Sequence, residues 1–288
     1  MPELPEVETL RRQLETRIVG KTIKAVSVNW PKMVRPLSAG QFTKALKGKR
    51  IKSVERRAKI LIIALSAQQF VVVHLKMTGQ LIFQPKKGEL VVGGHPQSGG
   101  LDNLPNKYTH VTINFTDGSI LYFNDLRKFG WMRLVDQKIL NEMTSAYGIE
   151  PLSKEFTLKR FTEIIRRYPK RNIKKILMDQ ELIAGVGNIY ADESCYSAGV
   201  RPMRLAHDVA DLEIKSLHHH LKRILNVSIL KKGTSARNYL TAEGIAGGYV
   251  KYLNVYGRQR DCCKKCKTQL VKIKLNGRGT HYCPQCQR

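Results

Sequence analysis

Acidic residues are scarce in this sequence. The chain holds 23 Asp and Glu against 50 Lys and Arg in 288 residues, which gives a formal net charge of +27. A soluble surface explains an excess of a few positive charges, but not one of this size. The imbalance therefore indicates a polyanionic partner, and it favours nucleic acid over an anionic membrane.

Long apolar runs are also lacking. No run approaches the roughly 18 residues that a transmembrane helix needs, and the N-terminus has no basic segment followed by an apolar stretch, as a signal peptide would. We therefore expect a cytosolic protein with no membrane partner. In that compartment the six cysteines are expected to be metal ligands or buried thiols and not disulfides.

Hydrophobic periodicity changes along the chain. Apolar residues at helical spacing from Val7 to Ile18 predict an amphipathic helix near the N-terminus. Strand-like segments separated by turn signals follow as far as residue 136 and predict an antiparallel sandwich or barrel. Residues 85–106 are rich in Gly, Pro and polar residues and predict a long mobile loop. From about residue 138 the pattern becomes helical.

A pair of CxxC motifs is the strongest spacing signal. Cys263 and Cys266 are separated by sixteen residues from Cys283 and Cys286. Two such knuckles at this separation are typical of four thiolates around one zinc ion, and a site with four protein ligands is structural. Cys262 does not have the two-residue spacing to Cys266. The predicted cofactor is therefore one structural Zn²⁺.

A hairpin is predicted between the two CxxC motifs. Apolar and Lys residues alternate from Val271 to Leu275, and Asn276-Gly277 follows as a tight turn. Arg278 is therefore expected at the tip of a zinc-bound finger, where it contacts a phosphate or is directed at a site elsewhere in the molecule.

The segment AGVGNIY at 184–190 is a second candidate for nucleic-acid binding. It is not a dinucleotide fingerprint, because no strand precedes it and Tyr190 occupies the third glycine position. A glycine-rich turn that opens a helix near Asn188 presents free backbone N–H groups to a phosphate, and Lys170 and Lys174 lie nearby. The alternative interpretation is a simple packed turn.

The first residues, MPELPEVETL, combine Pro2 with two carboxylates, Glu3 and Glu6. Taken alone, this pattern indicates N-terminal processing and favourable charge at a helix start. Together with RRAK at 56–59, HLKM at 74–77, RKFG at 127–130, LIAGVGNIYADE at 182–193 and the terminal CxxC hairpin, it resembles the bacterial formamidopyrimidine-DNA glycosylase family. The resemblance covers essentially the whole chain and is weakest over 85–106.

The resemblance implies a catalytic role for Pro2. Once Met1 is removed, Pro2 carries a secondary amine whose pKa lies far below that of a lysine, so it can attack C1′ of a damaged nucleotide and form a Schiff base. Glu3 resembles the general acid that assists opening of the sugar ring, and Glu6 a second carboxylate that organises the site. Lys59 resembles the lysine that contacts the lesion phosphate and supports β-elimination, and Arg278 the finger arginine that promotes δ-elimination.

The resemblance also implies DNA-binding residues. Met77, Arg127 and Phe129 resemble the side chains that fill the gap left by an extruded base, because apolar wedges unstack and kink a duplex. His74, Asn188, Lys170 and Lys174 resemble residues that bind the DNA backbone. The segment 233–250 resembles a loop that closes over the everted base. The implied partner is double-stranded DNA with oxidised purine lesions, bound by a monomer in the bacterial cytoplasm at the nucleoid.

The expected fold class is α+β. It has an N-terminal antiparallel β-sandwich with a leading helix, and a C-terminal helical domain with a helix–two-turn–helix and a four-cysteine zinc-finger hairpin. The predicted domains are a catalytic sandwich, a linker, a helical DNA-binding domain and a zinc finger, at 2–136, 137–151, 152–248 and 249–288.

Some positions depart from the family pattern. Lys107-Tyr108-Thr109-His110 stands where the family has Lys-His-Asp-His, so that Tyr108 takes the place of a histidine that binds phosphate, and its phenol can donate instead. Two other functions remain open from the residues. One is an endonuclease VIII-like glycosylase for oxidised pyrimidines, and the other is a non-catalytic zinc-ribbon DNA-binding protein.

Overall fold

The structure, a computed structural model, describes residues 1–95, 101, 103–234 and 248–288. The chain folds into two compact units. The first comprises Met1–Ser145 and Lys232–Gly248, and the second comprises Ala146–Lys231 and Tyr249–Arg288. Each unit has its own hydrophobic core.

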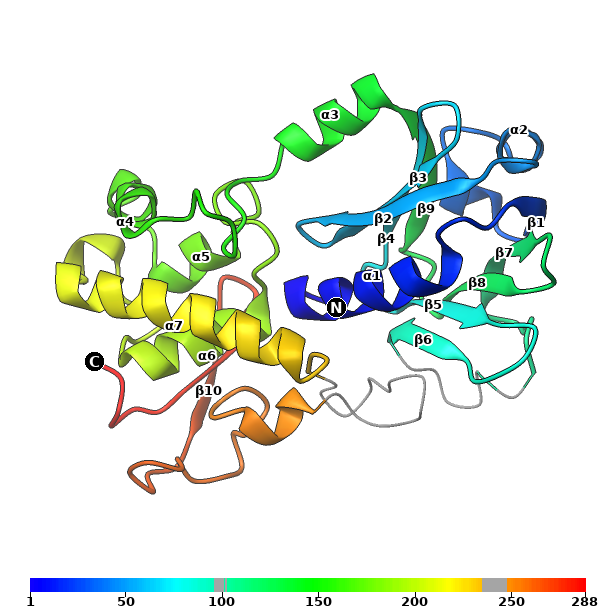
Figure 1. Cartoon of the computed structure of the whole chain (residues 1–288). Helices are drawn as coiled ribbons and strands as arrows, with labels where there is room; N and C mark the ends of the chain where they lie inside the picture. Colours follow the sequence, from blue (N-terminus) through cyan, green and yellow to red (C-terminus); the bar gives the residue numbers. More distant parts are fainter. Residues whose placement is uncertain (96–100, 102, 235–247) are drawn as a thin grey trace. The chain divides into compact units, whose positions relative to one another are not determined.

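The first unit contains one long helix and two antiparallel sheets (Figure 1). Helix α1 (Leu4–Ile18) opens the chain. The five-stranded sheet has the order β1 (Ile23–Val28), β7 (Thr109–Phe115), β8 (Ile120–Asp125), β5 (Gly79–Gln84), β6 (Val91–Gly94). The four-stranded sheet has the order β2 (Ile51–Arg57), β3 (Ile60–Leu65), β4 (Gln69–His74), β9 (Trp131–Asp136). The connections include η1 (Pro31–Val34), α2 (Ala39–Leu46) and α3 (Gln137–Ser145). The expected pair of antiparallel sheets behind a leading helix is confirmed.

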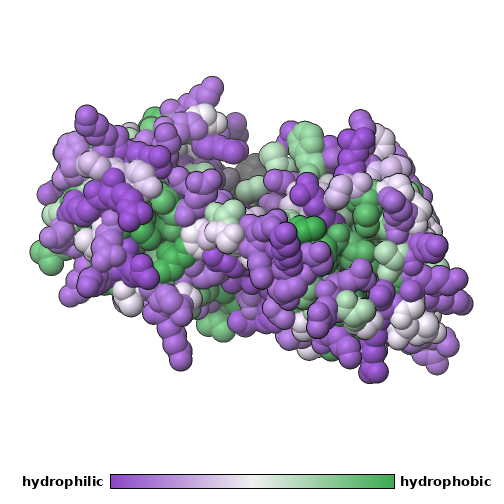
Figure 2. All heavy atoms as spheres, turned by 90° about the horizontal axis from the view of Figure 1, so that it is seen from above, coloured by the Kyte–Doolittle hydropathy of each residue, from purple (hydrophilic) through white to green (hydrophobic). Residues whose placement is uncertain are grey.

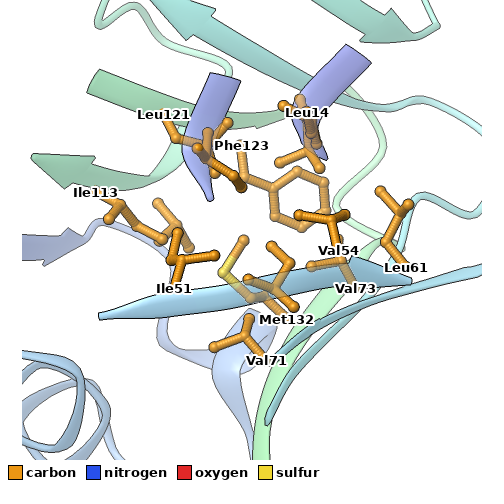
Figure 3. Close-up of a cluster of buried hydrophobic side chains, with 14 of the residues drawn as sticks. Leu14, Ile51, Val54, Leu61, Val71, Val73, Ile113, Leu121, Phe123 and Met132 are labelled. Carbon is orange, nitrogen blue, oxygen red and sulfur yellow. The ribbon is translucent and has the colours of Figure 1, made fainter. Parts of the chain in front are cut away.

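Both sheets and α1 contribute to one core. Figure 3 shows Leu14 of α1 directed toward Phe123 of β8, with Val54 of β2 and Met132 of β9 on the other side of the cluster. These side chains are at most 1% exposed. Helix α1 is therefore held by the same apolar packing that joins the sheets, and this packing determines where its N-terminal turn lies.

The prediction of a long loop over 85–106 is wrong for part of that segment. Val91–Gly94 form β6, which pairs antiparallel with β5. Val91 and Val92 are 7% and 2% exposed, and Val92 packs with Ile82 and Tyr122 in a small cluster of its own. The strand was missed because two of its four residues are glycines, which are depleted from strands.

The second unit is helical and ends in the predicted hairpin. Its helices are α4 (Leu158–Arg167), α5 (Ile173–Met178), α6 (Asn188–Ala198) and α7 (Asp211–Leu230), with the short turns η2 (Ala206–Asp208) and η3 (Tyr249–Tyr252). Strands β10 (Val271–Leu275) and β11 (Arg278–Tyr282) form the hairpin. Across the described residues, none of the helices has the length and apolar character required to span a bilayer.

Two further side chains of this unit pack against its helical core. Cys195 is a free thiol that is fully buried in the helical core. His218, the first of the three consecutive histidines, packs on Phe156 and Phe161, and its Nε2 lies 2.9 Å from the Phe156 carbonyl oxygen. Polar side chains cover much of the face drawn in Figure 2, as the net charge of +27 requires.

Candidate active site and nucleic-acid interface

The first turn of α1 holds the candidate nucleophile and its carboxylates. Pro2 and Glu3 are buried, and Glu3 is the N-cap residue of the helix. Glu6 Oε2 accepts a hydrogen bond from the Glu3 backbone N–H at 2.9 Å. Glu6 Oε1 accepts two more, from the backbone N–H of Thr234 at 2.7 Å and from its hydroxyl at 2.9 Å. The Glu6 carboxylate thus joins the start of the chain to residue 234, which suits a positioning role.

Lys59 lies on a tight hairpin turn. Residues 58 and 59 connect β2 to β3, and Ala58 adopts φ +51°, a conformation that such two-residue turns require. Arg56 Nη1 donates to the Ala58 carbonyl oxygen at 2.9 Å, while Arg56 Nε donates to Glu8 Oε2 at 3.1 Å. Lys59 itself is only 6% exposed. Glu8 of α1 therefore supports the turn that presents Lys59.

The Glu8 carboxylate of α1 is surrounded by three arginines. It forms ion pairs with Arg11, Arg12 and Arg56 at 2.8–3.1 Å. Burial alone would raise the pKa of Glu8, but the three guanidinium groups outweigh burial and lower it. Glu8 is therefore ionised near neutral pH and available to hold Arg56.

His74 is buried at the end of β4 and is neutral. Its Nδ1 accepts a hydrogen bond from the Lys76 backbone N–H at 2.9 Å, which leaves the proton on Nε2. Burial, with Lys76 and Lys59 nearby, lowers the pKa of His74 to about 3. The side chain is therefore a fixed N–H donor over the physiological pH range.

Met77, Arg127 and Phe129 come together at the surface of the first unit. Met77 and Phe129 are 39% and 53% exposed. The Arg127 guanidinium lies 4.7 Å from the centre of the Phe129 ring, and its Nη1 lies 3.1 Å from Met77 Sδ. Two apolar side chains of this size remain exposed beside a cation, which is the chemistry of a wedge that enters a base stack.

Asp125 organises the segment that carries Arg127 and Phe129. It is fully buried, and its carboxylate accepts hydrogen bonds from the Thr78 hydroxyl, from Arg127 N–H at 3.1 Å and from Gly130 N–H at 2.6 Å. Asp125 was not among the predicted site residues. An aspartate directly before a turn, within NDLRKFG, is the signal that could have identified it.

Tyr108 and its neighbours lie at the start of β7. Tyr108 is half-buried, with Lys107 Nζ 5.2 Å from the centre of its ring. Its carbonyl oxygen accepts from Asp125 N–H at 2.9 Å. His110 is the last residue of the segment 107–110, which differs from the family pattern. It is buried, and its Nε2 lies 2.7 Å from the Asp125 carbonyl oxygen. The segment is thus adjacent in structure to the one that carries Arg127.

The four predicted cysteines converge in the second unit. The Sγ atoms of Cys263, Cys266, Cys283 and Cys286 all lie within 4.8 Å of one another. The Cys263–Cys286 and Cys266–Cys283 sulfur distances are 3.8 and 3.4 Å. Tetrahedral zinc with Zn–S bonds of about 2.3 Å separates its ligands by about 3.8 Å. The residues therefore fit one structural zinc ion, and Cys262 is exposed outside the cluster.

Arg278 is exposed at the start of β11, and the next residues are held by two helices. The carbonyl oxygen of Gly279 accepts from Asn188 Nδ2 at 2.9 Å and from Lys174 Nζ at 3.1 Å. Lys174 Nζ also donates to Thr280 Oγ1 at 2.8 Å and forms an ion pair with Asp192 Oδ1 at 2.6 Å.

Lys174 and Asp192 are 1% and 0% exposed. The carboxylate of Asp192 also accepts from His281 N–H at 2.9 Å. The ammonium of Lys174 thus has three partners inside the second unit, so its contacts there position the finger hairpin. We call this set of residues, Lys174, Asp192, Thr280 and His281, the finger latch.

The remaining predicted backbone-binding residues differ in exposure. Lys170 is exposed, whereas Asn188 is half-buried and is the first residue of α6.

The acidic residue that follows Asp192 is structural as well. Glu193 is fully buried and accepts from the backbone N–H groups of Asn254, Val255 and Tyr256 at 2.9–3.0 Å.

Each unit therefore assembles part of the predicted site. Pro2, Glu3, Glu6, Lys59 and His74 belong to the first unit together with the wedge residues, and Arg278, Lys170, Lys174 and Asn188 belong to the second. Most of the predicted closing loop at 233–250 lies outside the described residues. The roles assigned to all these residues stay predictions.

Three family descriptions match successive parts of the chain. The Formamidopyrimidine-DNA glycosylase N-terminal domain matches residues 1–132, the Formamidopyrimidine-DNA glycosylase H2TH domain matches 147–239, and the zinc finger found in FPG and IleRS matches 262–288. The Formamidopyrimidine-DNA glycosylases of Carboxydothermus hydrogenoformans and Herpetosiphon aurantiacus are 39% and 40% identical over 288 residues, with all of both chains covered.

Solved structures are similar over the same length. The complex of Lactococcus lactis Fpg with DNA that contains an abasic site has a TM-score of 0.86 at 35% identity and covers 99% of each chain. The complex of wild-type L. lactis Fpg with DNA that contains an oxidised pyrimidine has a TM-score of 0.85 at 35% identity and covers 100% of each chain.

Proposed function

Because the chain belongs to the formamidopyrimidine-DNA glycosylase family, whose members repair oxidised bases by excision, we propose that it removes oxidised purines, 8-oxoguanine and formamidopyrimidines, from duplex DNA with Pro2 as the nucleophile. It then cleaves the abasic site by β,δ-elimination. The observation that carries this proposal is the first turn of α1. There Pro2 is buried beside Glu3, and Glu6 fixes the backbone between them.

The chemistry begins at the amine of Pro2. After removal of Met1, its lone pair attacks C1′ of the everted nucleotide, the glycosidic bond breaks, and the damaged base leaves with the bonding electrons. After the attack the Pro2 nitrogen passes its proton to the departing base, and Glu3 protonates the ring oxygen, so that the nitrogen lone pair opens the sugar and an iminium ion forms at C1′. Loss of the 2′ proton then expels the 3′ phosphate, and loss of the 4′ proton expels the 5′ phosphate. Lys59 and Arg278 bind these leaving groups as cations.

DNA binding combines a wedge with backbone contacts. Met77 and Phe129 enter the stack where the base is extruded, and Arg127 pairs with the orphaned cytosine. His74 donates its Nε2 proton to a phosphate, and Tyr108, Asn188 and Lys170 bind the backbone further along. The charge of +27 supports a location of the working enzyme on the nucleoid, and together with these contacts it predicts an affinity that depends strongly on salt.

A second substrate class is supported by one comparison. The L. lactis Fpg structure with oxidised-pyrimidine DNA describes a protein 35% identical to this chain. Oxidised pyrimidines are therefore a candidate substrate beside oxidised purines, and competition between matched duplexes would rank the two.

Borohydride trapping tests the proposal. We expect the Met1-processed protein to crosslink to a duplex with 8-oxoguanine opposite cytosine, and peptide mass spectrometry to locate the adduct on Pro2. Pro2→Gly retains a primary amine and tests whether a proline is needed, while an undamaged duplex of the same sequence measures background. Tight binding without a crosslink to either lesion class would support the zinc-ribbon binding protein instead.

A further inference from the structure

Strand β6 lies at the edge of the five-stranded sheet beside helix α1 (Figure 1). The two elements are in contact, and Gly93 of β6 approaches Leu10 of α1 especially closely. Leu10 is 1% exposed, so the contact is sealed from solvent. The proposed chemistry gives this strand no role, and it lies in the part of the chain where the family resemblance is weakest.

The contact leaves no room for a side chain at Gly93. A Cβ atom at Gly93 would lie 2.4 Å from Leu10 Cδ1, 2.9 Å from its Cγ and 3.0 Å from its Cβ. Leu10 is buried in the core, where close packing leaves little room for another rotamer to remove Cδ1 and Cγ, and its Cβ is fixed to the helix backbone. A residue larger than glycine therefore forces the helix and the strand apart.

The next residue fixes the strand against the sheet. Gly94 adopts φ +124°, and a Cβ there would lie 2.3 Å from the Gly79 carbonyl oxygen. In addition, His95 N–H donates to that same carbonyl at 3.1 Å. The strand is thus held firmly from the β5 side, so an added side chain at Gly93 displaces α1 more easily than it displaces β6.

We propose that β6 is a positioning element for the N-terminal nucleophile, with the Gly93–Leu10 contact setting the height of α1 above the sheet. The inference rests on the proposed role of Pro2. Helix α1 begins at Leu4, about 9 Å before Leu10 along the helix axis, and Pro2 directly precedes its N-cap residue Glu3, so a shift of the helix also moves Pro2. Restoring ordinary contact between Leu10 and an added Cβ moves α1 by about 1 Å, and an error of that size in a reacting group costs roughly tenfold to a hundredfold in rate.

Gly93→Ala is the central variant. We expect its single-turnover rate of borohydride trapping on the 8-oxoguanine duplex to fall at least about tenfold. Its Kd for a duplex with a non-cleavable abasic analogue should stay within about twofold, because the wedge and the phosphate-binding residues are unchanged. The double variant Gly93→Ala/Leu10→Ala removes the closest clashing atoms and should recover most of the lost rate.

Val92→Ala is the matched control. Val92 lies on the same strand but on the opposite face, packed with Ile82 and Tyr122 away from α1. Val92→Ala should lower the thermal midpoint while leaving the trapping rate within about twofold of the parent. Gly93→Ala should lower the trapping rate far more than a variant of equal thermal midpoint does.

Three outcomes would overturn this inference but leave the proposed function intact. These are an unchanged trapping rate in Gly93→Ala, a double variant as slow as Gly93→Ala, and a Val92→Ala variant equally slow. If Gly93→Ala fails to fold, Leu10→Ala opens the same contact from the helix side, and an unchanged rate there would also refute the inference. A parent protein that forms no Pro2 adduct would refute both the proposed function and the inference.

Discussion

Replacing Lys174 by methionine should destabilise the second unit because it breaks a buried ion pair. Lys174 and Asp192 are 1% and 0% exposed, and their charged atoms are 2.6 Å apart. Removing one member of such a pair leaves the other charge uncompensated, at a cost of about 3–5 kcal/mol. The Gly279 carbonyl and the Thr280 hydroxyl also lose a donor, so the hairpin that carries Arg278 should loosen.

Two companion variants separate this explanation from direct DNA binding. Lys174→Met/Asp192→Asn removes both charges while the new amide oxygen can still accept from His281 N–H, so it should recover at least half of the lost stability. Lys170→Met removes an exposed lysine that, like Lys174, was predicted from the sequence to bind the DNA backbone. It should leave stability within about 0.5 kcal/mol and reduce the salt dependence of DNA binding by about one counterion.

Urea unfolding of the zinc-loaded protein, followed by far-ultraviolet circular dichroism, measures the stability of the helical unit. DNA affinity as a function of salt measures the phosphate contacts. If Lys174→Met lost DNA affinity and salt dependence but kept its stability, Lys174 would bind phosphate directly and the finger latch would be refuted.

Three further predictions concern the other elements of the site. Burial with Lys76 and Lys59 nearby lowers the pKa of His74 to about 3, whereas the unfolded chain takes up this proton below about pH 6.5. His74 therefore reduces stability as pH falls through this window, by at most about 5 kcal/mol, and His74→Gln should flatten the stability–pH curve there; a curve of unchanged steepness would contradict the buried neutral state. Asp125→Ala removes the acceptor for three donors and should weaken wedge-dependent binding at a lesion at least about tenfold, with little change on undamaged DNA; an equal loss on both would show that the loop is merely misfolded. Cys266→Ser should release zinc and abolish binding at the finger while the first unit stays folded, as limited proteolysis would show, and retention of one zinc per chain would refute the four-thiolate site.

Much of the site could be predicted because its residues belong to short motifs. The CxxC spacing identified four ligands and excluded Cys262, since two-residue spacing constrains which sulfurs can share a metal. Met77, Arg127 and Phe129 come from two loops separated by some fifty residues, and the resemblance grouped them before the structure brought them together. Their contact could not be derived from spacing, because it depends on the pairing of β5 with β8.

The features that were missed depend on packing between segments distant in sequence. Val91–Gly94 is too short and too rich in glycine to show strand periodicity. Its glycines are explained only by packing, of Gly93 against Leu10 and of Gly94 against the Gly79 carbonyl oxygen. Lys174 was predicted to bind the DNA backbone together with Lys170, and that role stays a prediction, but its burial within α5 was not foreseen. Its acidic partner Asp192 lies on another helix, and no local pattern connects the two.

The hydrogen bonds of Glu6 to Thr234 have a consequence for the order of assembly during synthesis. They join residues 228 positions apart in the chain, so the first turn of α1 cannot acquire this support until nearly the whole polypeptide has been made. At ordinary rates of translation, about 5–20 residues per second, the delay is roughly 10–45 s. The N-terminus emerges from the ribosome first but is completed last, and a nascent or truncated chain therefore carries its terminal amine without the geometry that would direct it at DNA.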